Sequence, residues 1–427
     1  MVGENLDNQT VTTVSTNSKT IASSKLWIIF AVGLLVRLFL APFMGNPWDM
    51  YVWIQSGRDF LEHQINPYDI LYYKSISTGS YFAWYGYPPV WFFSIIQSYF
   101  LYTLLPWKNY ELAYLSIKMP LIAVDLLVGY IIYTQLRRKI GHKVALVAAS
   151  AYILNPYVIW ISAGWGIHDN FCAIFTLIAY IAYVNGHPKT SATSLGLAIA
   201  SKQYSIFALP AFLLFKPKTS SRLTYLITTA LVPLAVSLPF LVWNYRSYLF
   251  MLEFQAFRNP RGVTYWGALW LLHGLRMYEL EDYFIALSWI SIPLMLVTYG
   301  LIAFKALRNQ SGKTDFLSAL LACCLVYFLF ARNINTPFLV WICPLIVISA
   351  VSQRTRWELW AYALLSSLFM LYLAVYEPLP EFWGVMFPTA YYRNIQLRAF
   401  TLGIGITAVI VELFYFIKLL RKFWLNI

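Results

Sequence analysis

A polar, aromatic stretch near the N-terminus decides how the rest of this chain is organised. Residues 45–91 read GNPWDMYVWIQSGRDFLEHQINPYDILYYKSISTGSYFAWYGYPPVW and follow the first hydrophobic segment. Only 11% of the whole chain is charged, so a concentration of polar groups outside the apolar segments indicates a functional surface. The acidic and basic side chains of this stretch are Asp49, Arg58, Asp59, Glu62, His63, Asp69 and Lys74.

The composition of the chain is that of an integral membrane protein. Of its 427 residues, 60% are hydrophobic, whereas a soluble domain carries about 25% charged residues. Apolar segments of about 20 residues recur along the sequence, which favours spanning α-helices over a barrel. The net charge of +13 arises from Lys and Arg in short connections between these segments, as the positive-inside rule expects. We therefore predict an all-α protein in a lipid bilayer, with no nucleic-acid partner.

The distribution of basic residues also predicts the topology. We expect about twelve transmembrane helices with both ends in the cytosol. Residues 1–25 form a polar cytosolic tail, of which we expect 1–23 to be disordered. Residues 26–418 form one membrane domain, and 419–427 form a second cytosolic tail. Residues 45–118 form a long first outer loop, in which 89–105 lie at the membrane interface. Residues 244–283 form a second long outer loop.

The segment 194–215 contains a lysine, Lys202, close to its middle. Two short spans that meet at Lys202 keep the following basic residues in the cytosol, and a single span is the alternative. A cation within an apolar run is usually functional. We expect Lys202 to bind the phosphate of a lipid-linked donor, although a lysine that snorkels to the interface would give the same pattern.

Asp49 directly follows the first apolar segment, so its carboxylate is expected near the membrane interface. A carboxylate in that position can act as a general base that takes a proton from an acceptor hydroxyl. The alternative is that Asp49 caps a short helix over residues 50–61, because Asp is a preferred N-cap residue. The two roles are compatible with each other.

A second polar group reads SAGWGIHDN over residues 162–170. His168 and Asp169 are expected to open a helix on the outer face, where they could orient an acceptor, form a second acidic site or help to hold a metal. Helix capping is again the alternative, and one His–Asp pair is too little for a metal site.

Three arginines extend the candidate donor site, since guanidinium groups bind phosphate with two hydrogen bonds. They are Arg258, Arg261 and Arg332, and for each the alternative is a solvated loop charge. Two further charged residues, Arg37 and Asp125, lie inside apolar segments. We expect these two to pair with each other in a structural role.

Several of these motifs together resemble one family. Asp49 after the first span is followed by Ile65-Asn66-Pro67-Tyr68 and by Tyr87-Pro88-Pro89-Val90. Asp125-Leu126-Leu127, Asn155-Pro156, residues 162–170, residues 195–210 and RNINTPFLVWICP at 332–344 come later. In this order the motifs resemble the GT-C glycosyltransferases, and in particular the polyprenyl-phosphate-mannose-dependent mannosyltransferases of the GPI mannosyltransferase I type.

The resemblance implies a GT-C-like fold with interfacial helices in the first outer loop. It also implies a polyprenyl (dolichyl) phosphate-sugar donor, with mannose as the expected sugar, and a lipid-linked or glycan acceptor. Transfer would proceed with inversion on the outer or luminal face of the plasma membrane or an ER-equivalent membrane, with Asp49 as the base. The family carries an Asp-x-Asp pair where this chain has Pro47 and Asp49, so we expect no required metal, with Mg²⁺ or Mn²⁺ as the alternative. A transporter or flippase for lipid-linked sugars and a structural subunit are the competing hypotheses.

Overall fold

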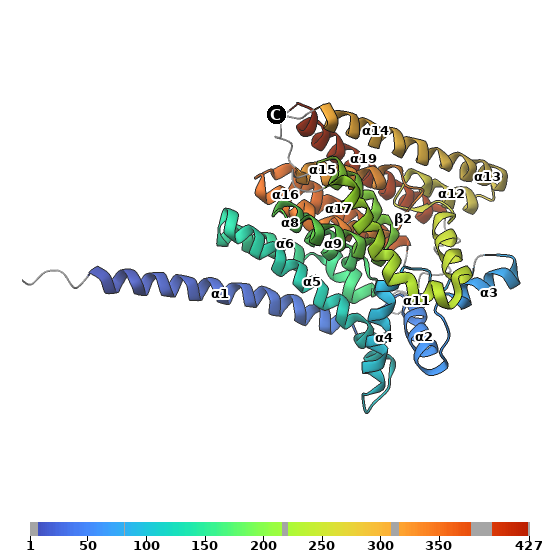
Figure 1. Ribbon diagram of the computed structural model, residues 1–427, viewed down its shortest axis with the longest axis horizontal. Coiled ribbons are helices and arrows are strands. Elements are labelled where there is room, and N and C mark those ends of the chain that lie inside the picture. Colours follow the sequence, from blue (N-terminus) through green and yellow to red (C-terminus); the bar gives the residue numbers. More distant parts are fainter. Residues whose placement is uncertain (1–6, 81, 216–220, 309–315, 377–394, 426–427) are drawn as a thin grey trace, which may run out of the picture.

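The computed structural model describes residues 7–80, 82–215, 221–308, 316–376 and 395–425. These residues are almost entirely helical (Figure 1). The strands among them are β1 (Arg261–Gly262) and β2 (Asn333–Ile334), which pair in parallel with Arg261 opposite Asn333. The expected all-α class is confirmed.

The long apolar helices form the framework of the molecule. Five helical segments of the described residues are long and apolar enough to cross a membrane, or six if a pair bent by 48° counts as one span. The five are α5 (Tyr110–Ile140), α11 (Arg222–Ala256), Tyr278–Arg308, α17 (Arg356–Tyr376) and α19 (Ile395–Leu425). The segment Tyr278–Arg308 combines α13 (Tyr278–Leu287), η4 (Ser288–Ile290) and α14 (Ser291–Arg308). The bent pair is α6 (His142–Ile153) with Pro156–Trp165.

Shorter apolar helices fill the interior between the long ones. They are α8 (Asp169–Val184), η2 with α10 (Gln203–Leu214), α15 (Phe316–Phe330) and η5 with α16 (Thr336–Ser352). All residues of 317–329 in α15 and of 343–351 in α16 are buried. In contrast, Leu231, Leu238 and Val242 of α11 are more than half exposed. This distribution, with apolar side chains both inside and outside, is typical of a bundle that contacts lipid. The shorter helices lack the length of a full span, so the expectation of about twelve spans stays a prediction.

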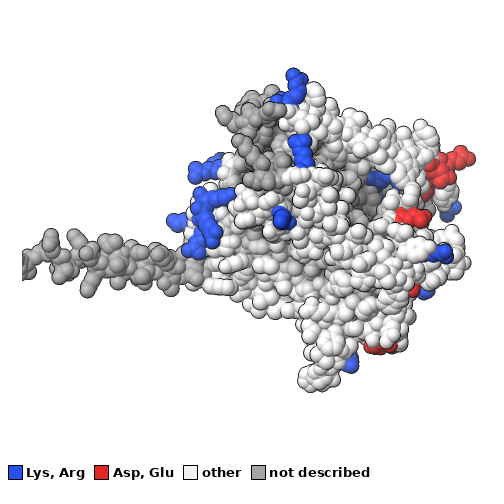
Figure 2. All heavy atoms as spheres, in the orientation of Figure 1, with Lys and Arg blue, Asp and Glu red and all other residues white. Residues whose placement is uncertain are grey.

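Charged side chains divide between two ends of the bundle. Figure 2 shows Lys and Arg without Asp or Glu at the end where Figure 1 places the α5–α6 connection and the last turn of α14, while the visible Asp and Glu lie towards the opposite end together with some Lys and Arg. The last turn of α5 contains Arg137, Arg138 and Lys139. Lys422 of α19 lies 3.9 Å from Glu358 at the start of α17. Basic clusters distant in sequence thus share one end, as a common cytosolic location requires.

The first outer loop is helical and lies against the end of the bundle. It contains α2 (Pro47–His63), α3 (Asp69–Thr78) and α4 (Pro89–Thr103). In Figure 1, α4 runs across the direction of α1 (Asp7–Leu40) and α5. A helix that crosses the direction of its neighbours is more consistent with a position at the membrane interface than with a transmembrane span.

One expectation about an irregular segment needs correction. Helix α1 begins at Asp7, so the polar residues from there to 23 are helical rather than disordered. Once the apolar part of α1 has formed, extending a helix is far easier than starting one. The second outer loop, 244–283, is largely helical. Helix α11 continues into it as far as Ala256, after a break at Asn244. Within the same loop, α11 is followed by β1, η3 (Tyr265–Gly267) and α12 (Ala268–Gly274).

Candidate functional site

Asp49 lies in the first turn of α2 but does not cap the helix. The cap is Asn46, whose side-chain oxygen accepts hydrogen bonds from the backbone N–H groups of Trp48 and Asp49, both at 3.1 Å. Pro47 at the first helical position favours this start. The capping interpretation of Asp49 is therefore wrong. Its half-buried carboxylate instead accepts a hydrogen bond of 2.7 Å from the indole Nε1 of Trp165.

Trp165 is held by an irregular segment of the bundle. It ends a π-helical turn, η1 (Trp160–Trp165), and the next residue, Gly166, has a φ of 89° that side chains with a Cβ rarely adopt. The carbonyl of Gly166 accepts a 3.1 Å hydrogen bond from Nε1 of Trp53 in α2. Two indole hydrogen bonds thus join α2 to the end of the π-helical turn, one to Asp49 from Trp165 and one from Trp53 to Gly166.

A buried lysine fixes the same turn from behind. Lys118 of α5 is fully buried, and its Nζ donates to the backbone oxygens of Ala41 at 3.1 Å, Ala163 at 3.0 Å and Gly164 at 3.3 Å, and also to Met44. It therefore joins the end of α1 to the turn that carries Trp165. Sequence analysis missed Lys118, which looks like an ordinary charge at the edge of an apolar segment.

Lys202 forms a buried ion pair with Asp169. Its Nζ lies 2.6 Å from Asp169 Oδ2, and the side chains are 2% and 0% exposed. The hydroxyl of Tyr204 donates to the other carboxylate oxygen at 2.5 Å. Lys202 has extended backbone angles between α9 (Pro188–Ser201) and η2 (Gln203–Ala208), which confirms the expected break. Because it is buried and paired, the snorkelling interpretation is wrong.

His168 and Asp169 are adjacent in sequence but contact different parts of the site. His168 is fully buried and stacks on Trp91 with a centroid distance of 5.1 Å and an angle of 5°. The rings of Tyr87 and Trp53 meet it edge-on at 4.7 and 5.8 Å. Asp169 instead binds Lys202 at the start of α8, as expected for an acidic residue at a helix N-terminus. His168 thus belongs to the aromatic contact between the first outer loop and the bundle.

Three of the four cations expected to bind the donor line one cavity of about 340 Å³: Lys202, Arg258 and Arg332. Its apolar walls include Leu252 of α11 and Ile292 and Met295 of α14. The fourth cation, Arg261, lies in β1 next to this cavity, because its backbone N–H donates to the carbonyl of Arg332 at 3.1 Å. The two-residue strand pair therefore brings together arginines that are far apart in sequence.

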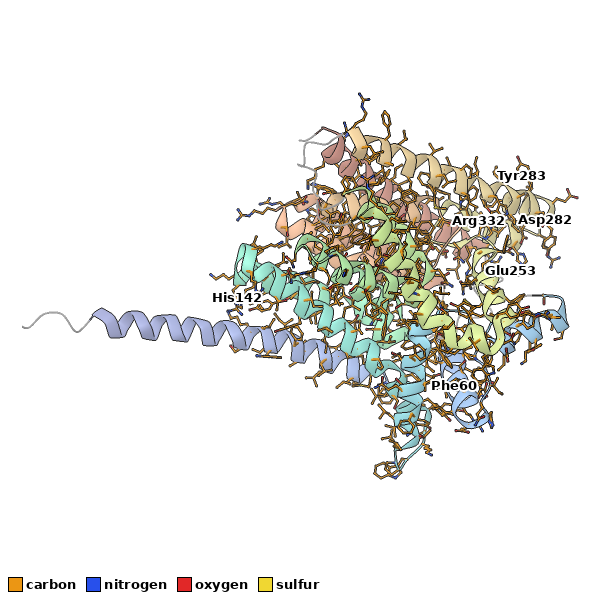
Figure 3. All side chains as sticks on the ribbon, in the orientation of Figure 1. Phe60, His142, Glu253, Asp282, Tyr283 and Arg332 are labelled. Carbon is orange, nitrogen blue, oxygen red and sulfur yellow. The ribbon has the colours of Figure 1, made fainter. Side chains whose placement is uncertain are left out.

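Arg332 is held in a defined orientation. Its Nε donates to Ser288 Oγ at 2.8 Å, and its guanidinium lies 3.6 Å from the ring centroid of Trp289. Figure 3 labels Arg332 near α12 and α13, at the end of the molecule away from the basic clusters. A guanidinium held in this way is preorganised for an anion, and only Arg provides both the stacking plane and the fork of donors.

Asp49 lies within the electrostatic field of these cations. Burial raises the pKa of Asp49 above its ordinary value, while the Trp165 hydrogen bond and the charges of Lys202, Arg261 and Arg258 act in the opposite direction. Burial and the neighbouring Arg261 lower the pKa of Arg258 to about 10. Tyr87 also lines the cavity, and its ring centroid lies 5.0 Å from Lys202 Nζ.

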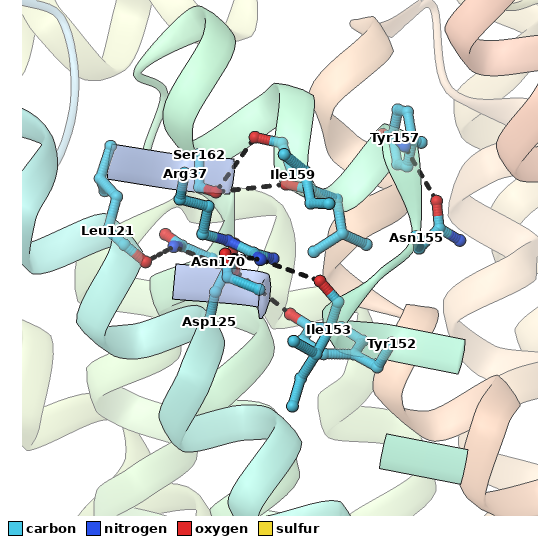
Figure 4. A network of polar contacts seen from close by, with 12 residues as sticks. Arg37, Leu121, Asp125, Tyr152, Ile153, Asn155, Tyr157, Ile159, Ser162 and Asn170 are labelled. Atoms are coloured by element: carbon cyan, nitrogen blue, oxygen red, sulfur yellow. Dashed lines mark hydrogen bonds and ion pairs between the residues drawn. The ribbon is translucent and has the colours of Figure 1, made fainter. Parts of the chain in front are cut away.

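A second buried ion pair supports the start of α8. Arg37 Nε lies 3.2 Å from Asp125 Oδ2, and both side chains are fully buried (Figure 4). Arg37 also donates to the carbonyl of Ile153 at 2.8 Å. Asn170 donates to Asp125 at 3.3 Å and to the carbonyl of Leu121 at 2.6 Å. The expected structural pairing is confirmed, and it fixes the residue that follows Asp169.

Comparisons with known proteins do not assign this chain to a family. No protein-family model matches the sequence, and a search of curated proteins finds no match. Within the described residues, no three side chains of His, Cys, Asp or Glu gather in an arrangement that could hold a metal ion. The expectation that no metal is required stays a prediction.

Proposed function

We propose that this protein is a GT-C type membrane glycosyltransferase. It moves a sugar, expected to be mannose, from a polyprenyl-phosphate donor to a lipid-linked or glycan acceptor on the outer or luminal face, with inversion. The observation that carries this proposal is the cavity in which Lys202, Arg258 and Arg332 meet apolar walls. Asp49 does not line this cavity, but the charges of Lys202 and Arg258 act on its carboxylate. A site of this kind suits an amphiphile with an anionic head.

The cavity matches a polyprenyl phosphate in both of its parts. Leu252, Ile292 and Met295 belong to α11 and α14, two helices whose outer surfaces carry many exposed apolar side chains. A prenyl chain can therefore remain in contact with lipid and apolar protein surface while its phosphate reaches the cations. Guanidinium and ammonium groups recognise phosphate through charge-assisted hydrogen bonds.

The proposed reaction assigns one role to each end of the site. Asp49 takes the proton of the acceptor hydroxyl, and the hydroxyl oxygen forms a bond to the anomeric carbon. The bond from that carbon to the phosphate oxygen breaks, and its electron pair leaves with the polyprenyl phosphate. Arg258, Arg332 and Lys202 stabilise the additional negative charge on the phosphate. Attack on the side opposite the leaving group inverts the anomeric configuration.

Asp169 has a supporting role in this scheme. Its contact with Lys202 Nζ at 2.6 Å keeps the lysine charged and aligned in an apolar environment. In the proposed twelve-span topology, the apolar part of α1 and the shorter helices α8, α9, α10, α15 and α16 would make up the six remaining spans.

The test is an assay of the purified protein in nanodiscs with radiolabelled polyprenyl-phosphate mannose or glucose and a panel of lipid-linked and soluble glycans. We expect a labelled glycoside that forms equally well in the presence of EDTA. A loss of product with EDTA that Mn²⁺ or Mg²⁺ restores would contradict the metal expectation. Translocation of labelled lipid in proteoliposomes, with no new glycosidic bond, would support the transporter hypothesis instead.

A further inference from the structure

A second cavity, of about 530 Å³, lies between α2, α4 and the start of α5. Its volume is within the range of about 300–1,000 Å³ that is typical of small-molecule sites. We call it the tyrosine groove, because five tyrosines contribute to its lining: Tyr51, Tyr99, Tyr102, Tyr110 and Tyr114. None of the residues in the proposed transfer reaction lines it.

The charges of the tyrosine groove are largely balanced. Arg58 Nε lies 3.2 Å from Glu62 Oε2, and Tyr99 donates a 2.8 Å hydrogen bond to the other oxygen of Glu62. Lys108 is the further cation in the lining. The lining contains two cations and one carboxylate, so it lacks the three clustered cations of the cavity at Lys202, Arg258 and Arg332 and the concentration of positive charge that phosphate recognition uses. An uncharged ligand fits this balance better than an anion.

The remaining groups are those that recognise sugars. Tyr51 and Tyr110 are 53% and 81% exposed, so parts of their rings are free to contact a ligand. The C–H face of a pyranose ring packs against an aromatic face, as other apolar surfaces do. Glu62, Arg58 and Gln55 supply planar acceptors and donors for the hydroxyl groups at the ring edge.

We propose that the tyrosine groove binds a short uncharged oligosaccharide, as a site separate from the cavity that contains Lys202, Arg258 and Arg332. Its inner wall is close to α2: a Cβ atom on Gly45 would lie 2.7 Å from the Tyr114 ring and 2.9 Å from Met50 Cγ. Gly45, just before α2, therefore packs closely against Tyr114 in the wall of the groove. The site goes beyond the proposed transfer reaction, because binding needs neither donor nor catalysis.

The experiment is saturation-transfer difference NMR on the full chain in nanodiscs of phosphatidylcholine, with linear mannotriose and N,N′-diacetylchitobiose as probes. We expect saturation transfer to at least one probe. Tyr51→Ala and Glu62→Gln should each weaken its binding by about tenfold, the ratio that corresponds to about 1.4 kcal/mol. Both positions are well exposed and outside the bundle core, so folding should be preserved.

Two control variants make the result specific. Tyr283→Ala removes an exposed tyrosine from α13, a helix that does not line the groove. This variant should bind the probe like the wild type. Asp49→Asn should also bind it normally, even though it should not transfer sugar. Binding without transfer would thus leave this proposal standing and count against the proposed function alone.

The proposal is overturned if neither oligosaccharide shows saturation transfer, or if the Tyr51 and Glu62 variants bind as the wild type does. A parallel series in nanodiscs with phosphatidylglycerol tests the other occupant, a lipid headgroup. If the groove substitutions reduce retention of phosphatidylglycerol and leave sugar binding unchanged, the groove is a headgroup site and the carbohydrate assignment is wrong.

Discussion

Trp165 Nε1 donates a hydrogen bond of 2.7 Å to Asp49 Oδ2, across 116 positions of sequence. This contact joins the first outer loop to a π-helical turn of the bundle and occupies one oxygen of the carboxylate. Among the described residues, no hydrogen bond joins the other oxygen, Oδ1, to another group. In the proposed reaction, that oxygen accepts the proton of the acceptor.

The Trp165 contact predicts a shift in pH dependence. The hydrogen bond from Trp165 lowers the pKa of Asp49 relative to burial alone, so Trp165→Phe should raise that pKa. Because a general base works only when deprotonated, the rise of kcat/KM with pH should move to higher pH in the variant. Trp360→Phe, at an exposed position of α17, is the matched control. An unchanged acidic limb in Trp165→Phe would show that Asp49 does not control it.

The Lys202–Asp169 pair predicts that a single substitution affects stability as well as activity. Lys202→Met leaves a buried carboxylate without its cation, and breaking a buried pair costs about 3–5 kcal/mol. We expect a lower Tm for this variant and partial recovery in Lys202→Met/Asp169→Asn. In the double variant, kcat/KM for the donor should still fall by roughly 2–4 kcal/mol, because one stabilising charge is missing. Normal transfer by the double variant would remove Lys202 from the donor site.

Arg332 should not tolerate replacement by lysine. Its guanidinium stacks on Trp289 and donates to Ser288, and a lysine cannot reproduce both contacts. We expect Arg332→Lys to raise the donor KM roughly 10–100-fold, the worth of one charged hydrogen bond of about 1.5–3 kcal/mol. Arg246→Lys, at an exposed position of α11, should have little effect. Equal kinetics in the two variants would contradict a phosphate contact at Arg332.

The topology can be tested by labelling introduced cysteines from outside, after replacement of the four buried native cysteines. Asn259 and Ser77 are exposed in the outer segments and should react. Ser75 lies in the same predicted outer loop, but it is a poor labelling position because it is buried and accepts a hydrogen bond from the N–H of Phe82. Gln310, in a basic connection that the sequence assigns to the cytosol, lies outside the described residues. Exposed Lys143, beside the basic end of α5, is therefore the better cytosolic position. Reaction at Lys143 from outside would reverse the assignment of the two ends.

Local signals in the sequence predict several parts of this arrangement. A lysine inside an apolar run predicts the break at Lys202, and two opposite charges inside spans predict the pair of Arg37 with Asp125. Each of these interpretations depends on the high cost of an unpaired charge among apolar groups. The Asn-Pro pair at 46–47 also indicates the true start of α2. By residue type alone, however, Asp49 is as suitable an N-cap as Asn46.

Tertiary contacts account for what the sequence does not reveal. Lys118 donates to carbonyls from two distant segments. Every residue has a backbone carbonyl, so the residue types in the sequence do not indicate these acceptors. From sequence we expected Lys202 to bind a donor phosphate, but within the protein it pairs with Asp169. The turn before α8 places the Asp169 carboxylate beside the break at Lys202. The two-residue strands that place Arg261 opposite Asn333, next to Arg332, are too short to give an alternating pattern.

The most direct test of the central claim is the transfer rate of Asp49→Asn with radiolabelled polyprenyl-phosphate mannose. Asn46 rather than Asp49 caps α2, and an Asn side chain can still accept the Trp165 hydrogen bond, so the variant should accumulate and bind donor normally. Loss of the proton acceptor should lower turnover by roughly 10²–10⁴. Asp59→Asn and Asp69→Asn in the same loop should be mild. An Asp49→Asn enzyme that transfers sugar at the wild-type rate would contradict the account and direct the search for a base to Asp169.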